Sequence, residues 1–104
     1  MKLVRDKIPD MIMKKEKSVQ MRVADSAEYD LFLIKKLKEE VEEFIDDRNI
    51  EEMADIEEVL RCYAEQKGID WSQVEALRQK KSEEKGSFKK RIIIEMVEDE
   101  KKSD

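Results

Sequence analysis

The sequence predicts an all-α protein built as an antiparallel helical bundle. Three observations predict it: helix-forming residues dominate, helix breakers are rare, and apolar residues recur at helical spacing. Charged residues make up 47% of the chain and hydrophobic residues 39%, with only one proline and two glycines. Such a composition favours long helices joined by short connections. A chain of 104 residues has room for one modest core, so we expect a single domain over residues 1–96 and a disordered charged tail over 97–104.

The first part of the chain reads as an extended lead, a short helix and then a long one. Pro9 suits the first turn of the short helix, where its missing N–H costs little. The long helix is expected over about 26 to 46. Asp25 and Ser26 are the candidates for its N-cap, and Asp25 with Glu28 has the spacing of a capping box.

Two further helices follow at short intervals. Asn49 is placed to cap a helix over about 50 to 67, which Gly68 ends. Another helix is expected over about 71 to 85, ended by Gly86. The turn between the first two long helices spans about four residues, and a connection this short makes them antiparallel neighbours.

Two segments carry β-branched residues outside these helices. They are SVQMRVA at residues 18–24 and KKRIIIEM at residues 89–96. Each can be an extended connector or a short strand, and two such strands can pair within one chain or between chains. A short two-stranded element is therefore part of the expected architecture.

The high charge fraction leaves each helix with thin apolar coverage. A monomer of this size and composition has little apolar surface to bury, so its stability would be marginal. We therefore expect the bundle to be completed by oligomerisation, as a homodimer or a homotetramer.

Composition also limits the function. A net charge of −5 argues against a nucleic-acid binder, and no apolar run approaches the roughly 20 residues that cross a bilayer. We read no signal peptide, and the single cysteine, Cys62, fits a reducing cytoplasm. The absence of histidine removes the usual zinc ligand and the Ser-His-Asp and Cys-His arrangements. A metal here would be held by carboxylates, which suit Mg²⁺, Mn²⁺ or Ca²⁺.

Residues 38–60 contain eleven carboxylates, of which most belong to a solvated surface. A projection at roughly 100° per residue separates the others. With Leu37 as zero, Glu40 falls at about −60° and Glu43 at about −120°, along one border of an apolar stripe. With Ile56 as zero, Glu52 falls at about −40° and Asp55 at about −100°.

Carboxylates at the border of a buried face need a partner. A partly buried charge is costly unless it is paired or binds a metal, and four facing acids also repel one another. One or two Mg²⁺ ions would relieve both costs. The alternative is that Glu52 pairs with Lys36 or Lys7 while the other acids reach solvent.

The same acids stand in a recognisable order. Glu39 to Glu43 read E-E-x-x-E, and Glu52 to Asp55 read E-x-x-D. With KLVRDKIP at residues 2–9 and KxxEKGSFKKRI around Gly86, this pattern resembles the MazG-like all-α nucleotide pyrophosphohydrolases. It is most similar to a small subgroup described as phosphoribosyl-ATP pyrophosphohydrolase-like.

The resemblance implies a helical bundle that holds Mg²⁺, or alternatively Mn²⁺, between two antiparallel helices. Its members cleave the α–β phosphoanhydride of a nucleotide to give a monophosphate and pyrophosphate, in some cases to clear unwanted nucleotides. The implied metal ligands are Glu40, Glu43, Glu52 and Asp55. Glu39 is the implied catalytic residue, whose carboxylate orients the attacking water or holds a second metal.

Basic residues should complete the grip on the substrate phosphates. The candidates are Arg5, Lys7, Lys81 and Arg91, although each is also a plausible solvated charge. Two rival functions stay open: a non-catalytic helical oligomerisation module, and a module that binds nucleotide as a sensor without turnover.

Overall fold

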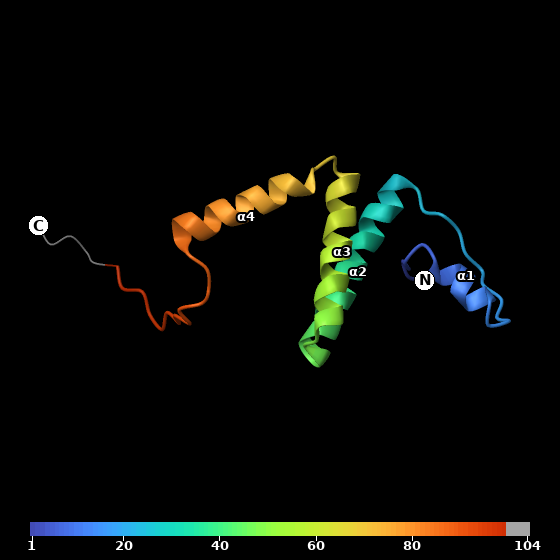
Figure 1. The fold of residues 1–104 in the computed structure, drawn as a ribbon, viewed down its shortest axis with the longest axis horizontal. Coiled ribbons are helices and arrows are strands. Elements are labelled where there is room, and N and C mark those ends of the chain that lie inside the picture. The colour runs from blue at the N-terminus through green and yellow to red at the C-terminus, as the bar shows by residue number, and fades with distance from the viewer. Residues whose placement is uncertain (100–104) are drawn as a thin grey trace, which may run out of the picture. The chain divides into compact units, whose positions relative to one another are not determined.

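The computed structural model describes residues 1–99, and these residues contain four α-helices and no strand (Figure 1). The chain divides into two compact units, of which the first is Met1–Trp71 and the second starts at Ser72. The all-α class is therefore confirmed. Within residues 1–99, none of the helices is both long and apolar enough to cross a membrane. Residues 100–104 of the expected tail lie outside the described residues.

The first unit is built on two long helices that pack against each other in antiparallel directions (Figure 1). They are α2, Ser26–Asp47, and α3, Ile50–Gln66, joined by only two residues. Arg48 makes this tight turn in the left-handed conformation, with φ 50°, and its N–H donates to Phe44 O over 2.7 Å. The predicted neighbours and their short connection are thus present.

Local capping sets the ends of these helices, as predicted. Asp25 Oδ1 accepts from the Glu28 N–H, and Asn49 Oδ1 accepts from the Glu52 N–H, each over 2.9 Å. At the other end of α3, Gly68 adopts a left-handed φ of 71°. This conformation lets the N–H groups of residues 68 and 69 donate to carbonyls in the last turn, which is the Schellman arrangement.

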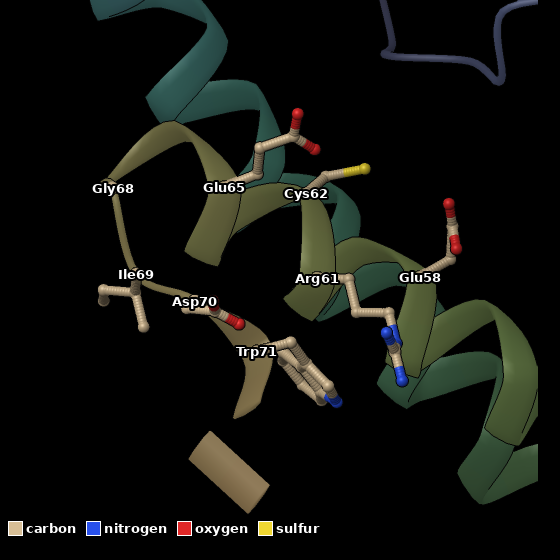
Figure 2. A pocket seen from close by; sticks show the side chains of 8 residues that line it. All are labelled: Glu58, Arg61, Cys62, Glu65, Gly68, Ile69, Asp70 and Trp71. Carbon is tan, nitrogen blue, oxygen red and sulfur yellow. The ribbon is translucent and has the colours of Figure 1, made fainter. Parts of the chain in front are cut away.

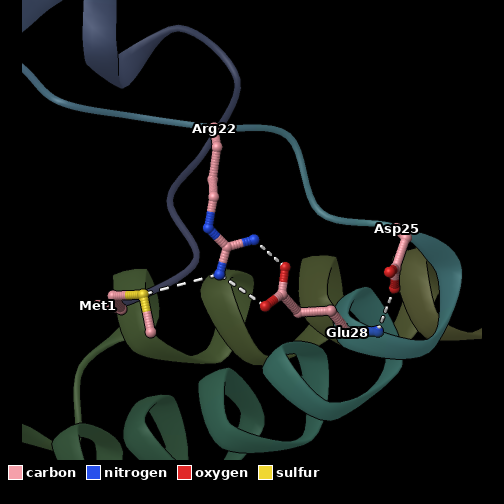
Figure 3. A network of polar contacts seen from close by, with 4 residues as sticks. All are labelled: Met1, Arg22, Asp25 and Glu28. Atoms are coloured by element: carbon pink, nitrogen blue, oxygen red, sulfur yellow. Dashed lines mark hydrogen bonds and ion pairs between the residues drawn. The ribbon is translucent and has the colours of Figure 1, made fainter.

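The N-terminal segment leads into the short helix α1, Ile8–Met13, with Pro9 in its first turn. An extended stretch then returns the chain to α2. Along it, Arg22 forms an ion pair with Glu28, and its Nη2 lies 3.7 Å from Met1 Sδ (Figure 3). Glu28 therefore pairs with Arg22, and only the Asp25 half of the expected capping box is formed.

The second unit contains the remainder of α4, Trp71–Lys85, which Gly86 ends with a left-handed φ of 84°. Neither of the two possible strands forms. Residues 18–24 and 92–94 lie outside the helices, and no β-ladder forms within residues 1–99. Isoleucine stabilises a strand when its side chain packs against neighbours on a half-buried sheet. Ile92, Ile93 and Ile94 are exposed and have no such neighbours, so their strand propensity has no effect.

The core between α2 and α3 is small. Among the apolar residues of the described part of the chain, only Leu33 and Ala64 are buried, and the carboxylate of Glu40 is buried with them. Apolar side chains along one border of the predicted stripe stay exposed. This surface, the apolar face, is formed by Leu31, Ile34, Val41 and Ile45 of α2 and by Ile50, Met53 and Leu60 of α3.

The apolar face and the acids lie on different sides of the helix pair. At roughly 100° per residue, both sets flank the stripe along which α2 and α3 meet. Because the helices are antiparallel, the apolar borders of both helices point to one side and the acidic borders to the other. The pair therefore has an acidic side and an apolar side.

The N-cap of α3 provides a direct test of the fold. Asn49→Ala removes the acceptor of the Glu52 N–H, which should destabilise the protein by about 1 kcal/mol. Thermal unfolding followed by circular dichroism measures this loss. Asn49→Ser is the matched control, because serine also caps, and it should retain most of the stability. Equal melting temperatures for the alanine variant and the natural protein would contradict the assigned cap.

Candidate functional site

The acids singled out in the sequence converge where α2 packs along α3. Glu40, Glu52 and Asp55 each offer an oxygen within 4.8 Å of the others, and so do Glu39, Glu40 and Glu43. Glu40 belongs to both groups and links them. Spacings of three and four residues place each helix's acids on one face, and the tight turn brings the two faces together. The carboxylate cluster is formed by Glu39, Glu40, Glu43, Glu52 and Asp55.

Glu40 is the buried centre of this cluster, with only 6% of its surface exposed. Its Oε1 lies 3.2 Å from Lys36 Nζ, one helical turn earlier. Its Oε2 has no hydrogen-bond partner within the described chain, and the same is true of Glu52 Oε2. Two buried carboxylate oxygens from facing helices therefore lack the positive partner or donor that burial demands.

The crowding of these acids changes their protonation. Burial, together with nearby Glu43 and Glu40, raises the pKa of Glu52 to about 7. The negative charge of Glu40 likewise raises the pKa of Glu43, and burial adds to the effect. Each shift has the same meaning: the folded protein disfavours a further negative charge at this place. A proton or a cation relieves that cost.

Three cationic side chains reach the cluster. Lys36 Nζ contacts Glu40 and also lies 3.5 Å from Glu39 Oε2. Burial opposes the charge of Lys36, but the two carboxylates outweigh it and raise its pKa. Arg5 Nη2 lies 2.7 Å from Asp55 Oδ1, and Lys2 Nζ lies 3.8 Å from Glu39 Oε1. Two of these cations come from the N-terminal segment.

The expected alternative partners of Glu52 are not found beside it. Lys36 contacts Glu40 and Glu39, and Lys7 is the N-cap residue of α1. Over residues 1–99, Glu52 forms no ion pair. The contact between Lys36 and Glu40 was missed, although their spacing of four residues on one helix is a signal that could have found it.

The four predicted phosphate-binding residues have different positions. Arg5 reaches the carboxylate cluster, whereas Lys7 caps α1 and is exposed. Lys81 lies on α4, and Arg91 follows it with a left-handed φ of 58°; both belong to the second unit. Their proposed phosphate contacts stay predictions. Lys2, which sequence reasoning did not single out, lies at the cluster instead.

A separate hollow of about 580 Å³ lies further along α3 (Figure 2). Trp71 forms one wall, and the Arg61 guanidinium lies over its ring at 4.8 Å. The other lining residues include three acids, Glu58, Glu65 and Asp70. This acidic lining is unfavourable for a phosphate, so the hollow does not extend a phosphate site.

The carboxylate cluster is chemically suited to a hard cation. All its donors are oxygens, and Mg²⁺ and Mn²⁺ prefer such ligands. The unpartnered oxygens of Glu40 and Glu52 come from both helices, and an ion held by Glu40, Glu52 and Asp55 would satisfy them. The expected fourth ligand, Glu43, belongs to the adjoining group with Glu39 and Glu40. Searches against family models, curated proteins and solved structures found no match to this chain.

The raised pKa of Glu52 predicts a pH dependence of stability in the absence of divalent cations. Because the folded state binds this proton more tightly than the unfolded state, the stabilisation is complete below pH 4.5 and is lost as pH rises through about 7. Thermal unfolding with a chelator present should therefore show a melting temperature that falls between pH 5 and about 8.

Glu52→Gln isolates this effect. The amide cannot ionise, so the decline over this pH range should become shallower in the variant, and at pH 8 the variant should be the more stable protein. A natural protein whose melting temperature is constant or rises over the same range would contradict the electrostatics of the cluster.

Proposed function

We propose that the chain is a Mg²⁺-dependent nucleotide pyrophosphohydrolase. It cleaves the α–β phosphoanhydride of a nucleoside triphosphate, or of a substrate like phosphoribosyl-ATP, to give a monophosphate and pyrophosphate. The observation that carries the proposal is the carboxylate of Glu40, which is buried yet has an oxygen without a hydrogen-bond partner among residues 1–99. The reaction is inferred from the resemblance of the two acidic motifs to those of the MazG-like pyrophosphohydrolases. The same resemblance is the basis for proposing a role in removing unwanted nucleotides.

Glu40, Glu43, Glu52 and Asp55 would hold the cation, with Mn²⁺ as the alternative ion. When bound, the ion neutralises phosphoryl oxygens and lowers the pKa of a water nucleophile. Positioning and charge neutralisation dominate phosphoryl transfer, so a chain without histidine is a reasonable catalyst. The carboxylates alone repel phosphates, but the cation that they would hold would keep the phosphates on the acidic side of the helix pair, where Arg5 and Lys2 lie.

Glu39 would act on the attacking water. Its carboxylate belongs to the group with Glu40 and Glu43, and it is contacted by Lys36 and Lys2. It is less buried than Glu40 and so is accessible to a water molecule. From this place it would orient the water and accept its proton, while the neighbouring lysines hold the carboxylate in position.

The rival functions are a non-catalytic helical oligomerisation module and a nucleotide sensor without turnover. Pyrophosphate release from a panel of canonical and modified NTPs, dNTPs and phosphoribosyl-ATP separates them from the enzyme. Turnover of one member supports the proposal. Mg²⁺-dependent binding with no turnover across the panel would favour the sensor, and absence of both Mg²⁺ and nucleotide binding would favour the oligomerisation module.

We also propose that the apolar face is covered by a second copy of the chain, giving a homodimer, with a homotetramer as the alternative. Seven large apolar side chains on one side of α2 and α3 are exposed, while only Leu33 and Ala64 are buried. Association through this side would bury the apolar surface that the small core leaves in water. It would also leave the acidic side open to substrate.

Cation binding should stabilise the folded protein. At a Mg²⁺ concentration about tenfold above its Kd, linkage raises the unfolding free energy by about 1.4 kcal/mol, which is about 6–11 °C in melting temperature for a domain of this size. Glu52→Gln should remove both this shift and Mg²⁺-dependent pyrophosphate release, yet remain folded. Circular dichroism and a pyrophosphate assay measure the two effects.

Glu51→Gln is the matched control for that variant. It removes the same charge from the neighbouring residue, which is exposed and outside the carboxylate cluster. It should keep both the Mg²⁺ shift and the activity. Full activity in Glu52→Gln, or equal losses in both variants, would show that the ligand assignment is wrong.

The proposed interface predicts a change of mass in solution. Ile34→Lys places a charge in the apolar face, so it should shift the protein from dimer to monomer in analytical ultracentrifugation. Leu77→Lys is the control, because Leu77 is a similarly exposed apolar residue on α4 outside this face. A natural protein that is monomeric at micromolar concentration would refute the interface.

A further inference from the structure

The N-terminal segment places two cations on the carboxylate cluster. Arg5 Nη2 lies 2.7 Å from Asp55 Oδ1, a contact between residues fifty positions apart in the chain. Lys2 Nζ lies 3.8 Å from Glu39 Oε1. These contacts bring residues 1–7 to the acidic side of α2 and α3. The N-terminal segment therefore contacts carboxylates of both α2 and α3.

The cations at the carboxylate cluster do not neutralise its negative charge. Lys2, Arg5 and Lys36 face five carboxylates, so two negative charges are uncompensated when all the acids are ionised. The charge that remains equals that of one divalent cation. An independent observation points to the same need: Glu40 is only 6% exposed, and its Oε2 has no partner among the described residues.

The three cations differ in how easily they can be displaced. Lys36 is 18% exposed, and its closest carboxylate is the buried Glu40. The Arg5 side chain is 56% exposed, and the one carboxylate that it contacts, Asp55, is itself 34% exposed. An ion pair this open to water is weak and readily exchanged. Lys2 is more open still, with 66% of its side chain exposed, but it contacts Glu39, which is not one of the four proposed metal ligands. Among the cations that contact those four ligands, Arg5 is thus the one that a stronger competitor would displace.

We propose that Arg5 exchanges partners when a divalent cation binds. In the cation-free protein Arg5 pairs with Asp55; the arriving ion takes over Asp55, and the released guanidinium pairs with a phosphate oxygen of the ligand that this ion holds. The proposal rests on the cation site of the proposed function. Arginine suits the second role, because its planar guanidinium donates pairs of hydrogen bonds that match phosphate oxygens. The guanidinium of Arg5 also starts in contact with Asp55, one of the proposed ligands of the ion.

This exchange gives Arg5 two effects of opposite sign. As a competitor for Asp55 and a positive charge near the site, it weakens the binding of Mg²⁺ alone. As a phosphate ligand, it strengthens the binding of a phosphate compound once Mg²⁺ is present. A residue that only maintained the shape of the site would strengthen both, so its removal would weaken both.

The test compares the full-length natural protein with Arg5→Gln by isothermal titration calorimetry. The first titration uses Mg²⁺ alone, and the second uses inorganic pyrophosphate at saturating Mg²⁺. We expect Arg5→Gln to lower the Kd for Mg²⁺ about three- to tenfold and to raise the Kd for pyrophosphate about tenfold. Lys15→Gln makes the same charge change at an exposed position after α1 and should alter each Kd less than about twofold, because solvent screens a distant surface charge.

The outcomes separate the exchange from the cation site itself. If the natural protein binds Mg²⁺ but Arg5→Gln binds it no more tightly, or binds pyrophosphate equally well, the exchange is wrong and the cation site stands. If the natural protein binds Mg²⁺ but not pyrophosphate, the exchange is wrong as well. If the natural protein binds no Mg²⁺, both proposals fail. Circular dichroism of Arg5→Gln confirms that the variant is folded before its constants are compared.

Discussion

A carboxylate buried between two helices must meet positive charge, and the acidic side of this protein is organised around that requirement at Glu40. One of its oxygens is satisfied by Lys36, a turn earlier on the same helix. The other oxygen has no hydrogen-bond partner among residues 1–99, and the nearby carboxylate of Glu52 from α3 adds repulsion rather than relief. Burial and like charge together raise the pKa of Glu52 to about 7, so near neutral pH the cluster is balanced between holding a proton and holding a cation.

Residues of α2 and α3 alone neither neutralise the acidic side of the helix pair nor cover its apolar side. The acidic side recruits the N-terminal segment through Arg5 and Lys2 and still retains negative charge. The apolar side exposes side chains that a core containing only Leu33 and Ala64 as buried apolar residues leaves uncovered. We infer that the cation and the second copy of the chain complete opposite sides of the same small framework. In this proposal the cation and the second copy would occupy different sides, so neither would block the other.

The sequence predicted most of what depends on neighbouring residues. The caps at Asp25 and Asn49 and the stop at Gly68 follow from local rules, and the helix boundaries agree within one residue. Helical projection placed Glu40, Glu52 and Asp55 on facing borders of α2 and α3, and the structure brings one oxygen of each within 4.8 Å of the others, while Glu43 groups with Glu39 and Glu40. The failures are nonlocal. The isoleucines at 92–94 predicted a strand, but strands need a partner, and the pair of Arg5 with Asp55 depends on the path of a segment fifty residues away.

The central claim, a divalent cation held between α2 and α3, is tested most directly by paramagnetic broadening of amide NMR signals with Mn²⁺. Substoichiometric Mn²⁺ should first broaden the amides around Glu40 and Glu43 and those from Glu52 to Asp55, and excess Mg²⁺ should restore them. Broadening that spreads evenly over exposed acids such as Asp46 and Glu98, with no preference for the carboxylate cluster, would contradict the account.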